Sequence, residues 1–264
     1  LYDIASRQTT ALLRNFAPSV ASYEWSAADN KVYFSADDRA YHGLFSLDMR
    51  THKVVRYELP VSYVQGYSIA TAMRNPRAVF FGQTAERARE MFMCNLTEKA
   101  KPATTLTGKI RFDKLYKDVA IGTCHEWQFK ATRGDSIDGF YLLPPDFNPE
   151  QTYPLIVYYY GGCTPTTQCL EFQYPLQVLA GQGYVVYAVN PSGTIGYGQE
   201  FAARHVNTWG KESGDDIIEG THKFCQEHPF VDAKRIGCMG ASYGGFMTQY
   251  LQTRTDLFAT AISH

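Results

Sequence analysis

The sequence predicts two architectures in one chain of 264 residues: an all-β first part of short antiparallel strands, then an α/β part around a mostly parallel sheet. Two observations predict this. An apolar two-strand pattern recurs after 47 positions in the first part, and strand-like runs alternate with helical ones in the second. The pattern changes near residue 125, so we expect one unit at 1–124 and another at 125–264.

The first unit repeats itself. Each copy has two apolar strands separated by a polar turn, and a third strand follows at 53–59 and, more faintly, at 103–106. Short strands at a period of about 40 to 50 residues are typical of β-propeller blades. We therefore expect the last blades of a propeller whose other blades precede Leu1; a β-meander in a smaller sandwich is the alternative. The copies lie at 32–35 with 44–48 and at 79–82 with 91–95.

The second unit begins with strands and continues as an α/β alternation. Two of its runs, 154–160 and 184–189, are apolar on both faces, as expected of central strands covered by helices. Parallel strands joined by helices imply right-handed crossovers. The expected elements are strands at 126–131, 137–143, 154–160 and 184–189 and a helix at 216–228.

A glycine-flanked serine follows these elements. Gly240-Ala241-Ser242-Tyr243-Gly244 lies between an apolar run at 235–239 and a helix-like run at 245–251. G-x-S-x-G between a strand and a helix is the nucleophile elbow of α/β-hydrolases. The turn strains the serine, and glycine two residues to either side avoids a Cβ clash. We expect Ser242 to be a nucleophile beside a helix N-terminus, which stabilises developing negative charge; a coincidental glycine turn is the alternative.

The sequence ends at His264, soon after this elbow. In α/β-hydrolases the acid and then the histidine follow the serine. The run 257–263 predicts the next parallel strand, and a base at His264 would leave no place for the acid. We therefore expect a fragment of a longer protein, with a sheet incomplete at its C-terminal side and the catalytic Asp and His beyond residue 264. The fragment alone is expected to be inactive, because a serine without its base is a weak nucleophile.

Composition disfavours several functional classes. The 25 basic and 26 acidic residues nearly cancel, so the charge gives no indication of nucleic-acid binding. No apolar run approaches the roughly 20 residues of a membrane span. No pair among the six cysteines has metal-ligand spacing, so we expect no metal and no cofactor. Cys163 and Cys169 share one polar loop, where free thiols are favoured over a disulfide.

Other polar residues receive structural interpretations. Asp215 and Asp216 precede the helical run and are expected to cap its N-terminus. His125, His205 and His222 are isolated from one another in the sequence. We expect these histidines to be ordinary surface or interface residues.

Together, these motifs resemble the prolyl oligopeptidase family of serine peptidases, and within it the dipeptidyl peptidase IV and acylaminoacyl-peptidase branch. The combination covers most of residues 126–264 and is far more specific than any single motif. Ser192 departs from the pattern, since many bacterial relatives carry arginine there, so salt bridges around it are expected to differ. The matching segments are 129–145, Tyr160-Gly161-Gly162, 190–198, Trp209-Gly210 with Asp215-Asp216, and 240–246.

The resemblance implies a chemistry. Ser242 would attack the scissile carbonyl of a short peptide and form an acyl-enzyme after a histidine removes its proton. The oxyanion would be bound by the backbone N–H of Tyr243 and, by the family's motif, by the hydroxyl of Tyr160. Tyr243 would also line the pocket for the residue before the cut. The alternative for Tyr160 is a core aromatic packed beside Tyr158 and Tyr159.

Other functions stay open. An α/β-hydrolase esterase would share the elbow but would not explain the 47-residue repeat, and a catalytically inactive propeller-hydrolase module would bind without turnover. Dipeptide release, acyl-amino-acid release and internal cleavage are all compatible with the sequence. For the full-length protein we expect peptide substrates without nucleic acid or membrane, with a homodimer left open. A periplasmic or secreted location is favoured over a cytoplasmic one, because many relatives with such propellers are exported.

Overall fold

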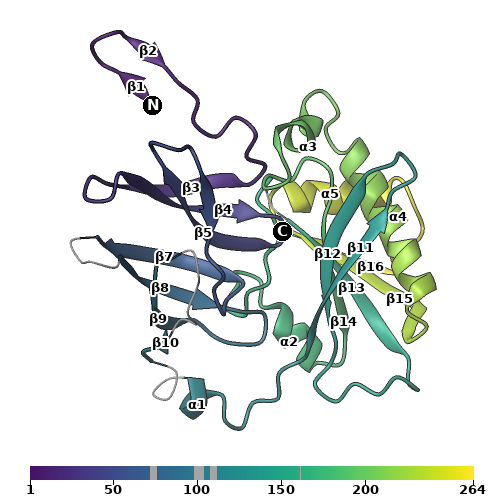
Figure 1. The fold of residues 1–264 in the computed structure, drawn as a ribbon. Coiled ribbons are helices and arrows are strands. Elements are labelled where there is room, and N and C mark those ends of the chain that lie inside the picture. Colours follow the sequence, from purple (N-terminus) through teal and green to yellow (C-terminus); the bar gives the residue numbers. More distant parts are fainter. Residues whose placement is uncertain (72–75, 98–103, 108–111, 161) are drawn as a thin grey trace.

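The computed structural model describes residues 1–71, 76–97, 104–107, 112–160 and 162–264. Two large sheets lie side by side, with the strands of the first half on the left of Figure 1 and the α/β half on the right. A short hairpin of β1 (Tyr2–Asp3) and β2 (Gln8–Thr9) extends from the first half. In the described residues, no helix is both long and apolar enough to span a bilayer.

The first half consists of two antiparallel four-stranded units joined edge to edge. The described strands form one sheet in the order β10-β9-β8-β7-β5-β4-β3, with β6 paired to β5. A single parallel bridge between His42 and Tyr63 joins the two units. The first unit is β3 (Ser19–Ser26), β4 (Lys31–Asp38), β5 (Tyr41–Asp48) and β6 (Val54–Arg56); the second is β7 (Tyr63–Ala70), β8 (Arg77–Gln83), β9 (Glu90–Asn95) and β10 (Thr104–Thr105).

The expected third strands therefore form as β6 and β10, although both are shorter than predicted. Residue 103 of the predicted 103–106 strand lies outside the described residues. The repeat is also visible in the packing. Phe34 stacks on Phe45 with ring centroids 5.4 Å apart, and Phe80 stacks on Phe92 at the same distance.

This packing corrects the predicted register of the repeat. Phe34 and Phe80 are equivalent, with each side chain 1% exposed, whereas the constant 47-residue offset would match Phe34 with Phe81, which is 45% exposed. The offset is 46 residues in the first strand and 47 in the second, because the loop between the paired strands is one residue longer in the second copy. A shift of one residue in a strand exchanges its two faces, so the constant 47-residue offset would match the buried Phe34 with a residue on the opposite face.

The second half is a mixed six-stranded sheet in the order β11-β12-β14-β13-β15-β16. The strands β14, β13, β15 and β16 are parallel, and β11 and β12 join them as an antiparallel pair. All six residues of β14 are buried, as the apolar run predicts. The strands are β11 (Cys124–Lys130), β12 (Ser136–Leu142), β13 (Tyr153–Tyr159), β14 (Val185–Asn190), β15 (Val231–Gly240) and β16 (Thr260–Ser263).

Helices cover both faces of this sheet (Figure 1). On one face Tyr187 of β14 packs with Phe224 and Met247, which belong to α4 and α5; on the other, Val186 packs with Leu176 of α2. Short helical segments complete the chain. The helices are α1 (Phe112–Leu115), α2 (Leu176–Gly181), α3 (Gln199–Ala202), η1 (Ala203–His205), α4 (Lys211–Glu227) and α5 (Tyr243–Gln252).

The start of α4 corrects the predicted helix cap. The helix begins at Lys211 after Gly210, so Asp215 and Asp216 lie inside it instead of capping it. Asp215 pairs with Lys211 one turn earlier, and Asp216 is completely buried against Arg133. The capping prediction failed because the helix extends N-terminal to its apolar pattern, over a turn with few apolar residues.

The two halves contact each other through loops that precede the helices of the second half. The backbone N–H of Gln168 donates to the carbonyl of Ala40, and that of Leu170 donates to Thr84. Ala40 and Ala85 are buried in one cluster with apolar residues of β12 and α2. The loop between β13 and α2 is therefore bound to the first half at two points.

Candidate active site

A strained serine lies at the turn between β15 and α5. Ser242 has φ 57° and ψ −115°, a region that non-glycine residues rarely occupy. A Cβ on Gly240 would lie 2.7 Å from the Gly244 carbonyl oxygen, and one on Gly244 would lie 2.5 Å from the carbonyl oxygen of Tyr160. The two glycines thus permit the tight approach of strand and helix that forces Ser242 outward, and its side chain is exposed.

The end of β16 holds this turn from its other side. The N–H of Ser242 donates to the carbonyl of His264 over 2.8 Å, and the N–H of His264 donates to the Gly240 carbonyl over 3.1 Å. A Cβ on Gly245 would lie 2.5 Å from the same His264 oxygen. The serine backbone is therefore fixed by neighbouring strands and not by the turn alone.

Tyr243 follows Ser242 as the first residue of α5. The N–H groups of a helix's first turn have no partner within the helix, and they attract negative charge. The Tyr243 ring is buried and stacks on the Tyr160 ring with centroids 5.7 Å apart. Its hydroxyl lies 3.3 Å from the Ser213 hydroxyl. The backbone of Tyr243 can thus face the serine while its side chain is anchored in the core.

Tyr160 directly follows β13, and its side chain is only 3% exposed. Its hydroxyl lies 2.9 Å from Nε2 of His205 and donates more weakly to the Ser192 carbonyl at 3.4 Å. Burial raises the pKa of Tyr160 well above its ordinary value, so its hydroxyl keeps its proton. Gly161, part of the predicted motif, lies outside the described residues.

Ser242 and Tyr160 line one cavity of about 610 Å³. Its wall includes Tyr158 and Tyr174 from opposite sides of the loop after β13, and His264 at the chain's end. The imidazole Nδ1 of His264 is hydrogen-bonded to the Tyr174 hydroxyl. The cavity therefore combines an exposed serine hydroxyl, a buried phenol and an aromatic wall, a lining that suits a peptide.

A charged network lies behind this cavity. Arg133 and Arg204 both donate to the Ser192 hydroxyl, over 2.6 and 3.1 Å. Both guanidinium groups also pair with Asp135, which lowers the pKa of that carboxyl, with Arg204 as the largest cause. Asp216 accepts the Ser192 N–H over 2.8 Å and pairs with Arg133; burial nevertheless raises the pKa of Asp216.

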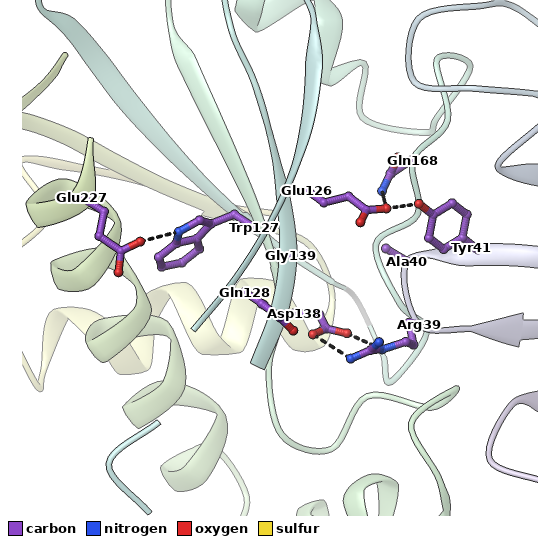
Figure 2. Close-up of a pocket in the computed structure, with 10 residues that line it drawn as sticks. All are labelled: Arg39, Ala40, Tyr41, Glu126, Trp127, Gln128, Asp138, Gly139, Gln168 and Glu227. Atoms are coloured by element: carbon purple, nitrogen blue, oxygen red, sulfur yellow. Dashed lines mark hydrogen bonds and ion pairs between the residues drawn. The ribbon is translucent and has the colours of Figure 1, made fainter. Parts of the chain in front are cut away.

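A second cavity of about 460 Å³, which Ser242 does not line, lies between the two halves. Figure 2 shows the residues around it. Its polar groups bind one another. Asp138 pairs with Arg39, and Glu126 accepts hydrogen bonds from Tyr41 and Gln168. Because the Arg39–Asp138 and Tyr41–Glu126 contacts join the two halves, this cavity is better described as part of the contact between them than as a reaction site.

The structure differs from the sequence expectations in the surroundings of Tyr160. His205, expected to be an ordinary surface or interface histidine, binds the Tyr160 hydroxyl and is partly buried. The contact joins residues 45 positions apart, so no local pattern indicates it. In the structure Gly193 makes room for this contact, since a Cβ there would lie 2.3 Å from the His205 ring.

The sequence also led to expectations about the cysteines and about metal binding. Cys163 and Cys169 are both free thiols, as favoured from the sequence. Among the described residues, no cluster of three or more His, Cys, Asp or Glu side chains could hold a metal ion.

Comparisons with known proteins find that this chain is similar to peptidases. The model of the prolyl oligopeptidase family matches residues 170–264. Dipeptidyl-peptidase 5 of Porphyromonas gingivalis is 29% identical over 264 residues, covering 99% of this chain and 37% of the relative. The uncharacterized peptidase YuxL of Bacillus subtilis is 27% identical over 241 residues, covering 90% and 35%.

A solved peptidase structure is also similar to this chain. An acylaminoacyl peptidase in complex with Z-Gly-Gly-Phe-chloromethyl ketone matches with a TM-score of 0.81 and 27% identity, covering 97% of this chain and 38% of that one. The comparisons confirm the resemblance to the prolyl oligopeptidase family and to its dipeptidyl and acylaminoacyl peptidase branch. The chain spans little more than a third of the length of these relatives.

Proposed function

We propose that the whole protein containing this chain is a serine peptidase that cleaves short peptides through an acyl-enzyme on Ser242. The single observation that carries the proposal is the strained Ser242 turn between β15 and α5, with φ 57° in a non-glycine residue. Such strain persists only where the surrounding structure imposes it, and it is concentrated at functional sites. The similarity to peptidases over nearly the whole chain supports the same function.

In the proposed reaction, a histidine of the whole protein takes the Ser242 proton while the serine oxygen attacks the scissile carbonyl. The carbonyl oxygen becomes an oxyanion, which the N–H of Tyr243 and the hydroxyl of Tyr160 bind. The carbonyl then re-forms as the histidine gives its proton to the leaving amine, and water hydrolyses the acyl ester to regenerate the Ser242 hydroxyl. We place Tyr243 also beside the substrate residue that precedes the cut. Its buried ring against Tyr160 supports a fixed wall at that point.

We further propose that 125–264 is the N-terminal part of an α/β-hydrolase domain and that 1–124 forms the last blades of a β-propeller. An antiparallel pair precedes the parallel strands, and helices cover both faces of the sheet; both features support the first assignment. Two equivalent four-stranded antiparallel units support the second. In the whole protein a propeller would restrict the site to short peptides.

The names of the relatives suggest two substrate classes: peptides from which an N-terminal dipeptide is released, and N-acylated peptides. The aromatic cavity beside Ser242 supports a peptide in either case. A panel of dipeptide amides, acyl-amino-acid amides and longer peptides, compared with simple acyl esters, would separate these classes from an esterase.

The proposal is tested on the full-length protein with a serine-directed phosphonate and intact mass analysis. We expect one adduct, located on Ser242 by peptide mapping, and none in the Ser242→Ala variant. The wild type should cleave an amide substrate. Prior treatment with the same phosphonate should abolish this cleavage. A folded full-length protein that forms no adduct and cleaves no peptide would instead be a catalytically inactive binding module.

A further inference from the structure

The imidazole of His205 is inserted into the group of rings that surrounds Tyr160. It comes from η1, between β14 and α4, and the chain makes room for it at Gly193. Gly193 has φ +97°, and a Cβ there would lie 2.3 Å from Nε2 of His205. A side chain at this position would therefore displace the imidazole.

Neighbouring rings fix the orientation of His205. Its ring meets that of Tyr243 edge to face, with centroids 4.8 Å apart and planes at 78°. Trp209 lies 5.7 Å from the His205 ring and 4.5 Å from that of Tyr243. Edge-to-face packing of this kind favours one ring orientation, and in it Nε2 lies 2.9 Å from the Tyr160 hydroxyl.

The proposed role of Tyr160 depends on the direction in which its phenolic proton points. A phenol has one proton, and to bind an oxyanion it must donate that proton to the substrate. A neighbouring acceptor would compete for it, whereas a neighbouring donor would leave it free. His205 can be either, because one ring nitrogen of neutral imidazole carries a proton and the other carries a lone pair. Burial lowers the pKa of His205, which favours this neutral form.

We infer that His205 is a positioning residue for Tyr160: its Nε2–H donates to the Tyr160 oxygen, so that the phenolic proton points to the substrate oxyanion. The inference rests on the proposed peptidase function. Donation to the phenol oxygen also polarises its O–H bond, which strengthens the bond that Tyr160 makes as charge develops. The weaker contact of Tyr160 with the Ser192 carbonyl, at 3.4 Å, gives the phenolic proton an acceptor before substrate arrives.

The test compares three variants of the full-length enzyme on a peptide amide. His205→Phe keeps an aromatic ring but loses the donor, and we expect kcat to fall about tenfold with little change in KM, less than the hundred- to thousand-fold loss of an oxyanion donor itself. His205→Gln provides an amide N–H and is expected to recover most of that loss. His222→Gln, on the exposed side of α4, is the matched control and should leave kcat unchanged.

A double-mutant cycle separates positioning from simple structural support. In a Tyr160→Phe background, His205→Phe should cause no further loss of kcat, because its effect passes through the missing hydroxyl. An equal loss in both backgrounds, or a His205→Phe enzyme with wild-type kcat, would overturn the inference while leaving the peptidase function intact. Failure of the peptidase function itself is recognised separately, by a wild-type protein without turnover or phosphonate adduct.

Discussion

The carbonyl oxygen of Tyr160 occupies the space that a side chain on Gly244 would need, since a Cβ at Gly244 would lie 2.5 Å from it. The end of β13 is thus pressed against the first turn of α5. This contact fixes the proposed oxyanion donor, Tyr160, relative to Ser242 two residues before Gly244. Preorganised donors of this kind stabilise a transition state because they need not reorganise when charge develops.

This contact predicts that Gly244→Ala is strongly destabilising. The new methyl group would meet backbone atoms, which cannot rotate away, so strand or helix must shift. Overpacking of a core costs about 1 to 3 kcal/mol, and we expect the upper part of that range. Urea unfolding measures it, with Gly66→Ala in β7 as control, because a Cβ there meets nothing within 4 Å. Equal destabilisation by the two substitutions would contradict the close contact.

Tyr160→Phe should reduce kcat of the full-length enzyme about a hundred- to a thousand-fold, the usual cost of one lost oxyanion donor, while KM changes little. The matched control is Tyr159→Phe. Its buried hydroxyl binds Thr248 over 2.7 Å, and its ring packs among the α4 and α5 side chains instead of lining the cavity. We expect this control to lose stability without losing kcat. Wild-type turnover in a folded Tyr160→Phe enzyme would remove Tyr160 from the proposed site.

The elbow was predictable because its cause is local. A strained serine needs glycines at fixed positions beside it, and the sequence shows Gly240 and Gly244 directly. The strand order could not be predicted in the same way, because an apolar run identifies a buried strand but not the strands beside it. The repeat was misaligned by one residue in its first strand, because the loop after that strand is one residue longer in the second copy, so that Phe80, and not Phe81, is the equivalent of Phe34.

The surroundings of the site were not predictable for the opposite reason. The contact of His205 with Tyr160 and the contacts of Arg133 with Ser192 join residues distant in the chain. A lone histidine or arginine in a sequence carries no sign of its partner. Asp216 was misassigned for the same reason, because this buried carboxylate pairs with the distant Arg133 and does not cap a helix end.

Asp135 predicts a specific acid dependence of stability. Its hydrogen bond to Arg204, reinforced by Arg133, lowers its pKa in the folded state. The stabilisation is therefore complete above the unfolded value, about 3.9, and is lost as the pH falls through the lower folded value. Asp135→Asn should cost about 2 kcal/mol at pH 7, the scale of hydrogen bonds to charged groups, and progressively less below about pH 4.

Urea unfolding between pH 2 and pH 7 checks this prediction, with pH values chosen around the ordinary Asp pKa of about 4. Asp215→Asn is the control, because the Lys211–Asp215 pair is exposed and solvent screens it. The difference in unfolding free energy between wild type and Asp135→Asn should shrink towards acid, whereas Asp215→Asn should show little difference at any pH. A difference for Asp135→Asn that is constant with pH would mean that its ionised form is not favoured by folding.

Ser192 predicts a different kind of effect, because its buried hydroxyl accepts from two guanidinium groups, those of Arg133 and Arg204. Ser192→Ala leaves both arginines paired with Asp135 but removes two charge-assisted hydrogen bonds, and we expect a loss of about 1 to 3 kcal/mol. Ser192→Arg should be worse, since a third guanidinium would enter a site whose residue is 1% exposed and already faces two positive charges.

An arginine at position 192 would therefore require a compensating change nearby. Combining Ser192→Arg with Arg133→Ser keeps the number of guanidinium groups at two and leaves Asp216 beside the new one, so the double variant should recover much of the stability lost by Ser192→Arg alone. Urea unfolding of the two single variants and the double variant measures this coupling. Additive losses would show that the charge of Arg133 does not exclude arginine at position 192, and that the packing around the buried Ser192 does.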